Sequence, residues 1–536
     1  MASSGADVRA ATPPPSTQAR PGIPRAVWAV TALHVVLLLG YSILVPALRG
    51  PDEYLHVDRA RILAPGAPAP AAGEASVSAP VLGALEWSPV YRAGSPPAAT
   101  IDAVPPGQRP PFTRLGPEGP TDVVNGTAQQ PPLVHAVGAV VLTAASVLPG
   151  WPWPFDQIVS LLRLVDVAIV AGVPLLAWAT ARRLGCPPRS ALTAAVLVLA
   201  VPQLTHVGST VNSDGLLVAL AGVLFLLGAR VVTGDDSVRT AVLAGAAAGA
   251  ALLTSGLAVV FIPWVVAVYL LAPATPRGPT SGPPRLAIVA SVATVAGGWW
   301  WVRDLIVEGH LPFGLDASQL SPVADGRPLA LTRAFSTLVG SFWGGFGWLE
   351  ASLPTVAVVA ATVVLAGAVG VAFWRGRVWA VRLRLALFVF PTAALATTTI
   401  GAAVVLSLTG DGAFTFQGRY LLAGLVGLVV VAAVGLDQLR DHPVPALPLL
   451  ALVGATAMQA MGIAAIAGRY WAGPSPGERF RTVLAFSPWP PVVAFFVCVG
   501  ILAVAAWALV EVGRAVHRSL PPPPPPRRRP AASDGG

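Results

Sequence analysis

Ionisable residues gather at positions 52–59, where the sequence reads DEYLHVDR directly after an apolar stretch. If this segment is a short helix, Asp52 and His56 share one side, and so do His56 and Arg59, because residues three or four apart are neighbours. A carboxylate beside histidine and arginine suits general-base catalysis, or a metal ion that in turn holds a phosphate. The alternative is a solvated helix start, where Asp52 and Glu53 only interact favourably with the helix dipole.

Three further polar groups border apolar stretches. Asp214 stands in NSDG (212–215), which is either part of a site or an Asx turn that begins a helix. Arg303 follows three tryptophans and is either functional or an interfacial anchor. Arg419 stands in QGRY (417–420), and its guanidinium can bind phosphate in a bidentate way. Because a charge in hydrocarbon costs about 2.5–3.5 kcal/mol even on insertion scales, such residues at a membrane border indicate a function.

Other patterns narrow the chemistry. No P-loop, Rossmann or HExxH motif occurs in the sequence, so nucleotide hydrolysis, dinucleotide binding and zinc proteolysis lack support. Arg163 and Asp166, three positions apart in an apolar segment, are expected to neutralise each other. His135 has apolar surroundings and is expected to be structural.

The composition indicates what positions these residues. Of 536 residues, 54% are hydrophobic and 11% are charged, whereas a soluble domain carries about 25% charged residues. The chain is therefore predicted to be an all-α polytopic membrane protein. Its basic residues are all arginine, and the net charge of +9 is interpreted as loop charge that fixes topology rather than as a nucleic-acid surface. Two cysteines, far apart, provide no disulfide framework.

Apolar segments long enough to cross a bilayer predict about twelve transmembrane helices. Clusters of arginine fall in alternate loops, which places those loops and both termini in the cytoplasm. Residues 131–149 are also apolar, but counting them would move the later arginines outside. We therefore expect a re-entrant or interfacial helix there, with a thirteenth crossing as the alternative. The predicted crossings are 27–48, 158–181, 189–207, 213–232, 238–254, 256–273, 284–302, 353–374, 385–408, 418–436, 445–467 and 491–511.

The positions of the apolar segments and of the arginine clusters divide the chain into five parts. Residues 1–26 and 512–536 are predicted to be cytoplasmic tails, the first disordered and the second rich in proline and arginine. Residues 27–302 form a membrane module with a large outer loop, 49–157. Residues 303–352 form an extracytoplasmic loop, and 353–511 form C-terminal membrane helices. The candidate residues thus converge on the outer face.

A resemblance covers residues 27–436. The segments PDEYLHVDRA, QPPLVHAVG, STVNSDGLL, WWWVRDLIVEGHLPFG, SFWGGFGW and FQGRYLLAG, in this order, resemble the DUF2142 family of predicted bacterial membrane proteins. That family is similar to the GT-C superfamily of polyprenyl-phosphate-dependent glycosyltransferases. The resemblance implies a GT-C-like N-terminal module of seven helices, with an acidic motif in a large first outer loop and another acid in the second. It fits the predicted topology only if 131–149 does not cross.

Roles follow from the resemblance, residue by residue. Asp52 or Glu53 would be the catalytic or metal-linked carboxylate, and Asp214 the acid of the second loop. Where relatives often show LTK, this chain has LTS (253–255), and PDEPAH is replaced by PDEYLH. Asp304 stands where asparagine is common. The residues expected to bind substrate are His56, Arg59, Gln130, Pro131, Pro132, Asn212, Arg303, Gln417, Arg419 and Tyr420.

The leading hypothesis is a glycosyltransferase of the bacterial plasma membrane that acts at its outer face. The donor would be a polyprenyl-phosphate sugar with its phosphate near Arg303 and Arg419. The acceptor would be an envelope glycan, lipid or protein, and no nucleic acid would take part. Either no cofactor takes part, or a divalent cation, Mg²⁺ or Mn²⁺, is held by Asp52 and Asp214; the sequence leaves both open. The alternatives are a transporter or flippase of lipid-linked glycan, which would favour charges at the midplane and internal repeats, and a non-catalytic GT-C-like protein.

Overall fold

The structure is a computed structural model that describes residues 22–64, 75–87, 104–117, 119, 121–272, 282–307, 309, 331–409, 417–442, 444–471 and 473–519. Most of this part of the chain is helical. The elements, in chain order, are α1 (Arg25–Leu44), α2 (Glu53–Leu63), α3 (Ala79–Glu86), η1 (Pro106–Gln108), η2 (Phe112–Arg114), η3 (Gly126–Gln129), α4 (Leu133–Ala145), α5 (Phe155–Val170), α6 (Val173–Arg183), α7 (Pro188–Leu199), α8 (Pro202–Val207), α9 (Ser213–Val232), α10 (Val238–Leu252), η4 (Gly256–Val260), α11 (Phe261–Leu270), α12 (Gly282–Ala293), η5 (Thr294–Gly298), α13 (Trp299–Val307), α14 (Leu331–Gly344), β1 (Gly345–Phe346), β2 (Ala351–Ser352), α15 (Thr355–Arg375), α16 (Trp379–Thr409), η7 (Gly418–Gly424), α17 (Leu425–Asp437), α18 (Leu447–Tyr470), α19 (Pro476–Phe486) and α20 (Pro491–Arg518).

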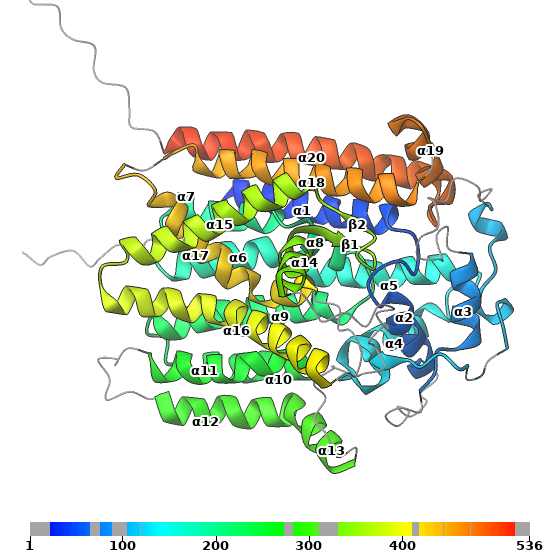
Figure 1. The fold of residues 1–536 in the computed structure, drawn as a ribbon, viewed down its shortest axis with the longest axis horizontal. Helices are drawn as coiled ribbons and strands as arrows, with labels where there is room; N and C mark the ends of the chain where they lie inside the picture. The colour runs from blue at the N-terminus through cyan, green and yellow to red at the C-terminus, as the bar shows by residue number, and fades with distance from the viewer. Residues whose placement is uncertain are drawn as a thin grey trace, which may run out of the picture.

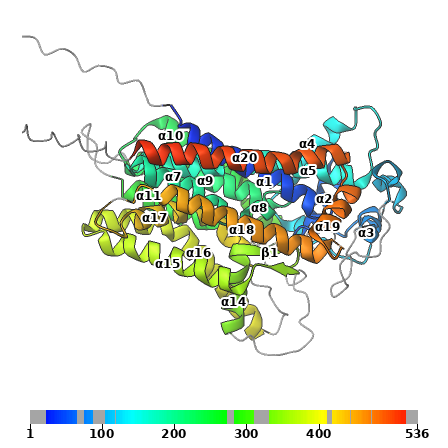
Figure 2. The ribbon, with the colours of Figure 1, turned by 90° about the horizontal axis from the view of Figure 1, so that it is seen from above.

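Apolar helices lie side by side and form one elongated bundle (Figure 1). Figure 2 shows from a second direction that α1, α18 and α20 run along the same axis. Nine helical stretches in the described part of the chain are long and apolar enough to cross a membrane. At the other three predicted crossings, the helices α7, α10 and α11 are shorter. The count of twelve therefore stays a prediction.

The helix of the predicted re-entrant segment, α4, lies at one end of the bundle. It has 13 residues, which make about 20 Å at a rise of 1.5 Å per residue. The hydrocarbon core is about 30 Å thick, so this helix falls short of it. It lies against α2 and also contacts α5 (Figure 1).

Small residues allow the helices to approach closely. A Cβ atom on Gly435 of α17 would lie 1.7 Å from the carbonyl oxygen of Ala368 in α15, so only glycine fits there. Such van der Waals contact drives helix association in a membrane, where lipid is as apolar as the side chains. Elsewhere the core is aromatic: the ring centroids of Phe225 and Trp264 are 5.2 Å apart, and those of Phe225 and Phe388 are 5.8 Å apart. These contacts join α9, α11 and α16.

Helix α16 contains a proline at position 391. Proline lacks the N–H that would bond to the preceding turn, so it weakens a helix at that point. The next residue, Thr392, donates its hydroxyl proton to the carbonyl oxygen of Gly424 at 3.1 Å, which ties α16 to η7. The half of α16 beyond the proline carries three consecutive threonines, 397–399.

Some predicted segments lie outside the described residues. These are most of the two tails, residues 65–74 and 88–103 of the predicted first outer loop, and most of 303–352 before α14. Within the described part, α20 continues beyond the predicted crossing and ends at Arg518.

Candidate functional site

A cavity of about 500 Å³ lies between α2, α9, η4, α16 and η7. Its charged and polar lining includes Asp52, His56, Gln130, Asp214, Arg419 and Tyr420. The segments of Ser255 at the start of η4 and of the threonines 397–399 of α16 also border it. Carboxylates, a histidine and a guanidinium thus converge on one space from segments that are far apart in the sequence.

Asp52 immediately precedes α2, yet its carboxylate does not cap the helix. Its backbone is left-handed, with φ at 57°, and its side chain makes no capping hydrogen bond. Aspartate is one of the few residues that tolerate this conformation. Instead, Asp52 Oδ2 accepts a hydrogen bond from Nη2 of Arg419. The structure therefore argues against the alternative in which Asp52 only begins a helix.

Arg419 lies between the two carboxylates of the cavity. Its Nη2 bonds to Asp52, and its Nε is 3.6 Å from Oδ2 of Asp214. The guanidinium carbon is 5.1 Å from the ring centroid of Tyr420. All three charged side chains are mostly buried, with 6%, 17% and 11% of Arg419, Asp52 and Asp214 exposed. The cluster is a charged unit held away from bulk water, where its mutual attraction is strong.

Close packing holds η7, and with it Arg419, against α14. A Cβ atom on Gly418 would lie 2.2 Å from the carbonyl oxygen of Leu338 and from the backbone nitrogen of Phe342. The N–H of Gly418 donates to Oγ of Ser341 at 2.7 Å. Only glycine permits this approach, so the position of Arg419 depends on the residue before it.

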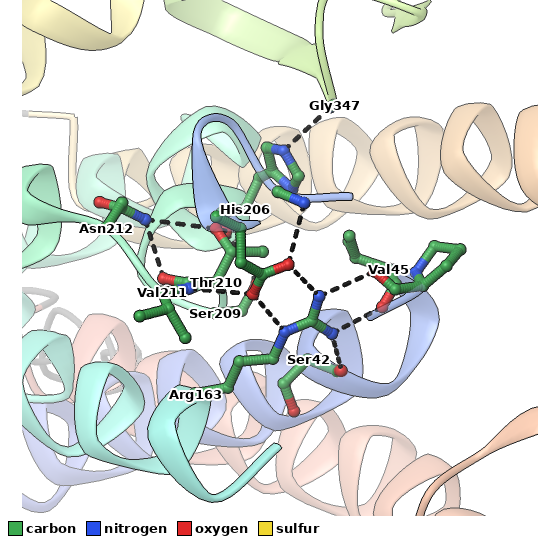
Figure 3. A network of polar contacts seen from close by, with 12 residues as sticks. Ser42, Val45, Arg163, His206, Ser209, Thr210, Val211, Asn212 and Gly347 are labelled. Carbon is green, nitrogen blue, oxygen red and sulfur yellow. Dashed lines mark hydrogen bonds and ion pairs between the residues drawn. The ribbon is translucent and has the colours of Figure 1, made fainter. Parts of the chain in front are cut away.

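Glu53 lies next to Asp52 but faces the protein interior, where it pairs with Arg163 of α5 (Figure 3). Arg163 donates from Nε and Nη2 to the two oxygens of Glu53, at 2.7 Å each. It also donates to the backbone carbonyls of Ser42, Val45 and Pro46 at 2.6–2.8 Å. Every nitrogen of this guanidinium is used, and the pair is almost fully buried.

The same glutamate also fixes the loop that leads to Asp214. Glu53 accepts hydrogen bonds from the N–H of Gly50 at 3.0 Å and of Val211 at 3.1 Å. The next residue, Asn212, caps α9: its Oδ1 accepts from the N–H groups of Asp214 and Gly215. The Glu53 carboxylate thus positions both loops that carry the cavity aspartates.

His56 pairs with His135 at the wall of the cavity. His56 Nδ1 and His135 Nε2 are 2.9 Å apart, and the rings are stacked with centroids at 5.1 Å. Burial lowers the pKa of His56 to about 4; Arg419 and Arg59 act in the same direction, and Asp52 acts against them. At neutral pH the ring is therefore uncharged, so one nitrogen donates and the other accepts.

This buried histidine predicts a loss of stability in acid. Between pH 6.5 and about 4, His56 binds a proton in the unfolded chain but not in the folded protein. The free energy of unfolding should therefore fall as the pH falls through this window, by about 3 kcal/mol from His56. Unfolding measured in detergent at pH 7, 5.5 and 4.5 checks this. His56→Gln should reduce the pH dependence, and the exposed His517→Gln should not; equal slopes in both variants would contradict the prediction.

The sequence matches a known family over most of its length. Residues 35–428 match the family described as Predicted membrane protein (DUF2142). The chain belongs to the DUF2142 family. This DUF2142 protein is thus a multi-pass membrane protein, in agreement with its nine long apolar helical stretches among the described residues. No curated protein matches the sequence.

The DUF2142 chain is similar to several solved structures. One is ArnT from Cupriavidus metallidurans bound to undecaprenyl phosphate, with 16% identity and a TM-score of 0.49, covering 92% of this chain and 76% of that one. The apo state of the same protein gives 17% identity and a TM-score of 0.47, with 92% and 74% covered. The Archaeoglobus fulgidus oligosaccharyltransferase tethered to an acceptor peptide gives 12% identity and a TM-score of 0.41, with 87% and 59% covered.

The structure sorts the predicted site residues of this DUF2142 protein into two groups. Six line the cavity: Asp52, His56, Gln130, Asp214, Arg419 and Tyr420. Seven lie outside its lining: Glu53, Arg59, Pro131, Pro132, Asn212, Arg303 and Gln417. Of these, Glu53 and Asn212 accept hydrogen bonds from backbone N–H groups of the loops that carry Asp52 and Asp214. Arg303 bonds to Asp304 at 2.7 Å and lies over Trp300, and Pro132 begins α4.

One expected pairing was wrong. Arg163 does not bond to Asp166 but to Glu53, which is 110 positions earlier in the chain. Asp166 is buried, and its Oδ1 has no hydrogen-bond partner among the described residues. Residues three apart on a helix are neighbours, but the long arginine side chain reaches the carbonyl groups at the end of α1 instead.

The donor set does not fit a divalent cation well. Within the described ranges, no group of three His, Cys, Asp or Glu residues is placed to hold a metal. Mg²⁺ binds through one or two carboxylates together with water and phosphate oxygens, but Asp52 and Asp214 already hold Arg419 between them. A cation there would displace the guanidinium, so no step below passes through a metal.

Sequence reasoning missed part of the cavity. The threonines 397–399 also line it, and the hydroxyl of Thr399 has no hydrogen-bond partner in the described part of the protein. Three consecutive threonines in an apolar helix were the available signal. Ser255 also lines the cavity; it stands where relatives carry lysine, and that departure marked the position.

Proposed function

We propose that this DUF2142 protein transfers a sugar from a polyprenyl-phosphate donor to a hydroxyl group of a cell-envelope acceptor, at the extracytoplasmic face of the plasma membrane. The observation that carries the proposal is the convergence of Asp52, Asp214 and Arg419 on one cavity, from three segments that each border an apolar helix. The ordered motifs resemble the DUF2142 family, and the similarity of that family to the GT-C superfamily supports the choice of a lipid-linked donor. The cavity lies at the N-terminal end of α2, where the acidic motif with Asp52 and Glu53 stands.

Asp52 is suited to act as the general base. Its Oδ2 accepts from Arg419, and its Oδ1 has no hydrogen-bond partner within the described residues. The free oxygen takes the proton of the acceptor hydroxyl as that oxygen attacks the anomeric carbon of the sugar. The bond from this carbon to the phosphate oxygen breaks, and polyprenyl phosphate leaves with the electron pair. The bound Arg419 fixes the direction of the carboxylate, which favours a reactive geometry.

Asp214 and Tyr420 complete the arrangement around Arg419. The Asp214 carboxylate holds the Nε side of the guanidinium, and Tyr420 lies beneath it. A guanidinium held from two sides cannot rotate freely, so the Asp52 carboxylate keeps one orientation. We propose that Asp214 is a positioning residue and that Tyr420 and Gln130 contact the sugar.

Lipid-linked sugars in a deletion strain test the proposed function. Without the protein, the unused donor should accumulate as a polyprenyl-phosphate sugar, and the corresponding sugar should disappear from the envelope. The purified protein in vesicles should then move the sugar from the extracted lipid to envelope acceptors, with release of polyprenyl phosphate. Movement of the lipid across the bilayer without release of phosphate would instead support a flippase. Unchanged lipids and envelope in the deletion strain would overturn the proposal.

A further inference from the structure

Arg59 of α2 is a buried arginine that forms no hydrogen bond with any described residue. Only 3% of it is exposed, and Nε, Nη1 and Nη2 all lack a partner among the described residues. Burial lowers its pKa to about 10, with Asp304 acting in the opposite direction. The group is therefore still charged at neutral pH, with five N–H donors to satisfy.

Arg163, the other buried arginine compared with it, has the hydrogen bonds that Arg59 lacks among the described residues. Both arginines are almost fully buried. Arg163 makes five hydrogen bonds to a carboxylate and three carbonyls, as a structural arginine must, because an unpaired buried charge is strongly destabilising. Arg59 makes none, and the carboxylate of Asp304, which acts on it through space, bonds to Arg303. The free-energy cost of a buried guanidinium without partners is tolerated in a protein when a ligand binds to that guanidinium.

Further unpaired polar atoms lie near Arg59, beside the cavity. His56, one turn earlier on α2, and Gln130 both line the cavity. Oε1 of Gln130 and Nδ1 of His135 have no hydrogen-bond partner in the described part of the chain. The charge of Arg59 acts on both His56 and His135. Polar groups without a hydrogen-bond partner among the described residues thus lie beside the polar lining of the cavity.

The formal charges of the cavity lining decide which residue can bind a phosphate. Asp52 and Asp214 contribute −2 and Arg419 contributes +1, so the lining carries a net charge of −1. A phosphate ester brought to this lining is repelled unless another cation compensates it. Arg419 is shared between two carboxylates, whereas the guanidinium of Arg59 is free to bind two phosphate oxygens in parallel.

We propose that Arg59 binds the phosphate of the substrate, with His135 Nδ1 as a second donor, when the side chains of His56 and Gln130 at the cavity wall turn aside. The inference rests on the proposed function, which supplies a lipid-linked phosphate as the source. It assigns the phosphate to Arg59 rather than to Arg303 or Arg419, and leaves Arg419 to orient Asp52.

Binding to the full-length protein in detergent tests this. The probes are undecaprenyl phosphate, undecaprenol and inorganic phosphate, and the variants are Arg59→Met, Arg59→Lys and the control Arg61→Gln. Arg61 is on the same helix but bonds to Ser78 and lies over Phe112. Arg59→Met should lower the affinity for undecaprenyl phosphate by about ten- to a hundredfold, Arg59→Lys should lower it less, and Arg61→Gln should not change it. Undecaprenol should bind equally to all. Competition by inorganic phosphate that Arg59→Met abolishes would identify free phosphate as a second source.

Thermal stability separates a binding role from a structural one. If Arg59 is an unpaired charge kept for a ligand, Arg59→Met should raise the melting temperature of the ligand-free protein and remove its increase on addition of undecaprenyl phosphate. A lower melting temperature together with unchanged affinity would overturn the inference. A wild-type protein that does not bind undecaprenyl phosphate would overturn the proposed function itself, whereas equal binding by wild type and Arg59→Met would overturn only the role of Arg59.

Discussion

Asp52→Asn should abolish sugar transfer, with a rate about 10² to 10⁴ times lower than that of the wild type, while the protein still folds. Loss of general-base catalysis has this magnitude, because an amide cannot take the proton of the acceptor. Asparagine also tolerates the left-handed backbone at this position. Its side-chain oxygen can still accept from Arg419, so the geometry of α2 should be kept. Transfer is measured in vesicles that contain the purified variant and the extracted donor.

The control for this variant is Asp122→Asn, which removes an exposed carboxylate from the first loop. It should leave the rate unchanged. Asp52→Glu provides a second comparison, because its carboxylate is one methylene further from the backbone and no longer faces Arg419 in the same way; its rate should lie between those of Asp52→Asn and the wild type. Full activity in a folded Asp52→Asn protein would exclude Asp52 as the base.

Arg163→Met should destabilise the protein by about 3–5 kcal/mol, the cost of leaving one partner of a buried ion pair alone. Here the remaining charge is Glu53, which is inaccessible to water. The loss also frees three carbonyl groups at the end of α1. Unfolding by denaturant in mixed micelles measures the effect. Transfer activity should fall in parallel, because Glu53 positions both loops that carry the cavity aspartates.

Two comparisons decide whether the pair acts as described. Arg375→Met breaks the exposed ion pair with Asp441, and such a pair is worth about 0–1 kcal/mol. The double variant Glu53→Leu with Arg163→Met removes both charges and should recover part of the stability. If Arg163→Met is no more harmful than Arg375→Met, the pair does not hold these loops.

The sequence was sufficient to find the charged residues of the cavity but not their partners. Asp52, Asp214 and Arg419 each stand where a polar residue meets an apolar segment, a local signal that needs no tertiary contact. Their meeting in one cavity follows the prediction that they share a face. The separate roles of Asp52 and Glu53 could not be predicted, because they depend on a left-handed backbone at Asp52, which turns two adjacent carboxylates in different directions.

Long-range packing explains the other differences. Arg163 was paired with its helical neighbour, but the carbonyls at the end of α1 and the carboxylate of Glu53 satisfy it more fully, and only the folded chain brings these groups together. His135 was expected to be structural, and the structure shows that it bonds to a cavity histidine. The pattern of apolar segments predicted the helices well, but three of them are shorter than a full crossing.

Two parts of the cavity wall should differ in how readily they change during evolution. Asp52, Asp214 and Arg419 belong to segments fixed by the Glu53 carboxylate and by the glycine contact with α14. Another part of the wall belongs to the half of α16 beyond Pro391 and consists of the small residues Thr397, Thr398, Thr399, Gly401 and Ala402. Under the proposed function, substitutions there should alter the room for the acceptor without disturbing Asp52, Asp214 and Arg419. Directed evolution toward a larger or smaller acceptor should therefore accumulate changes in this short stretch, and relatives with different acceptors should diverge there first.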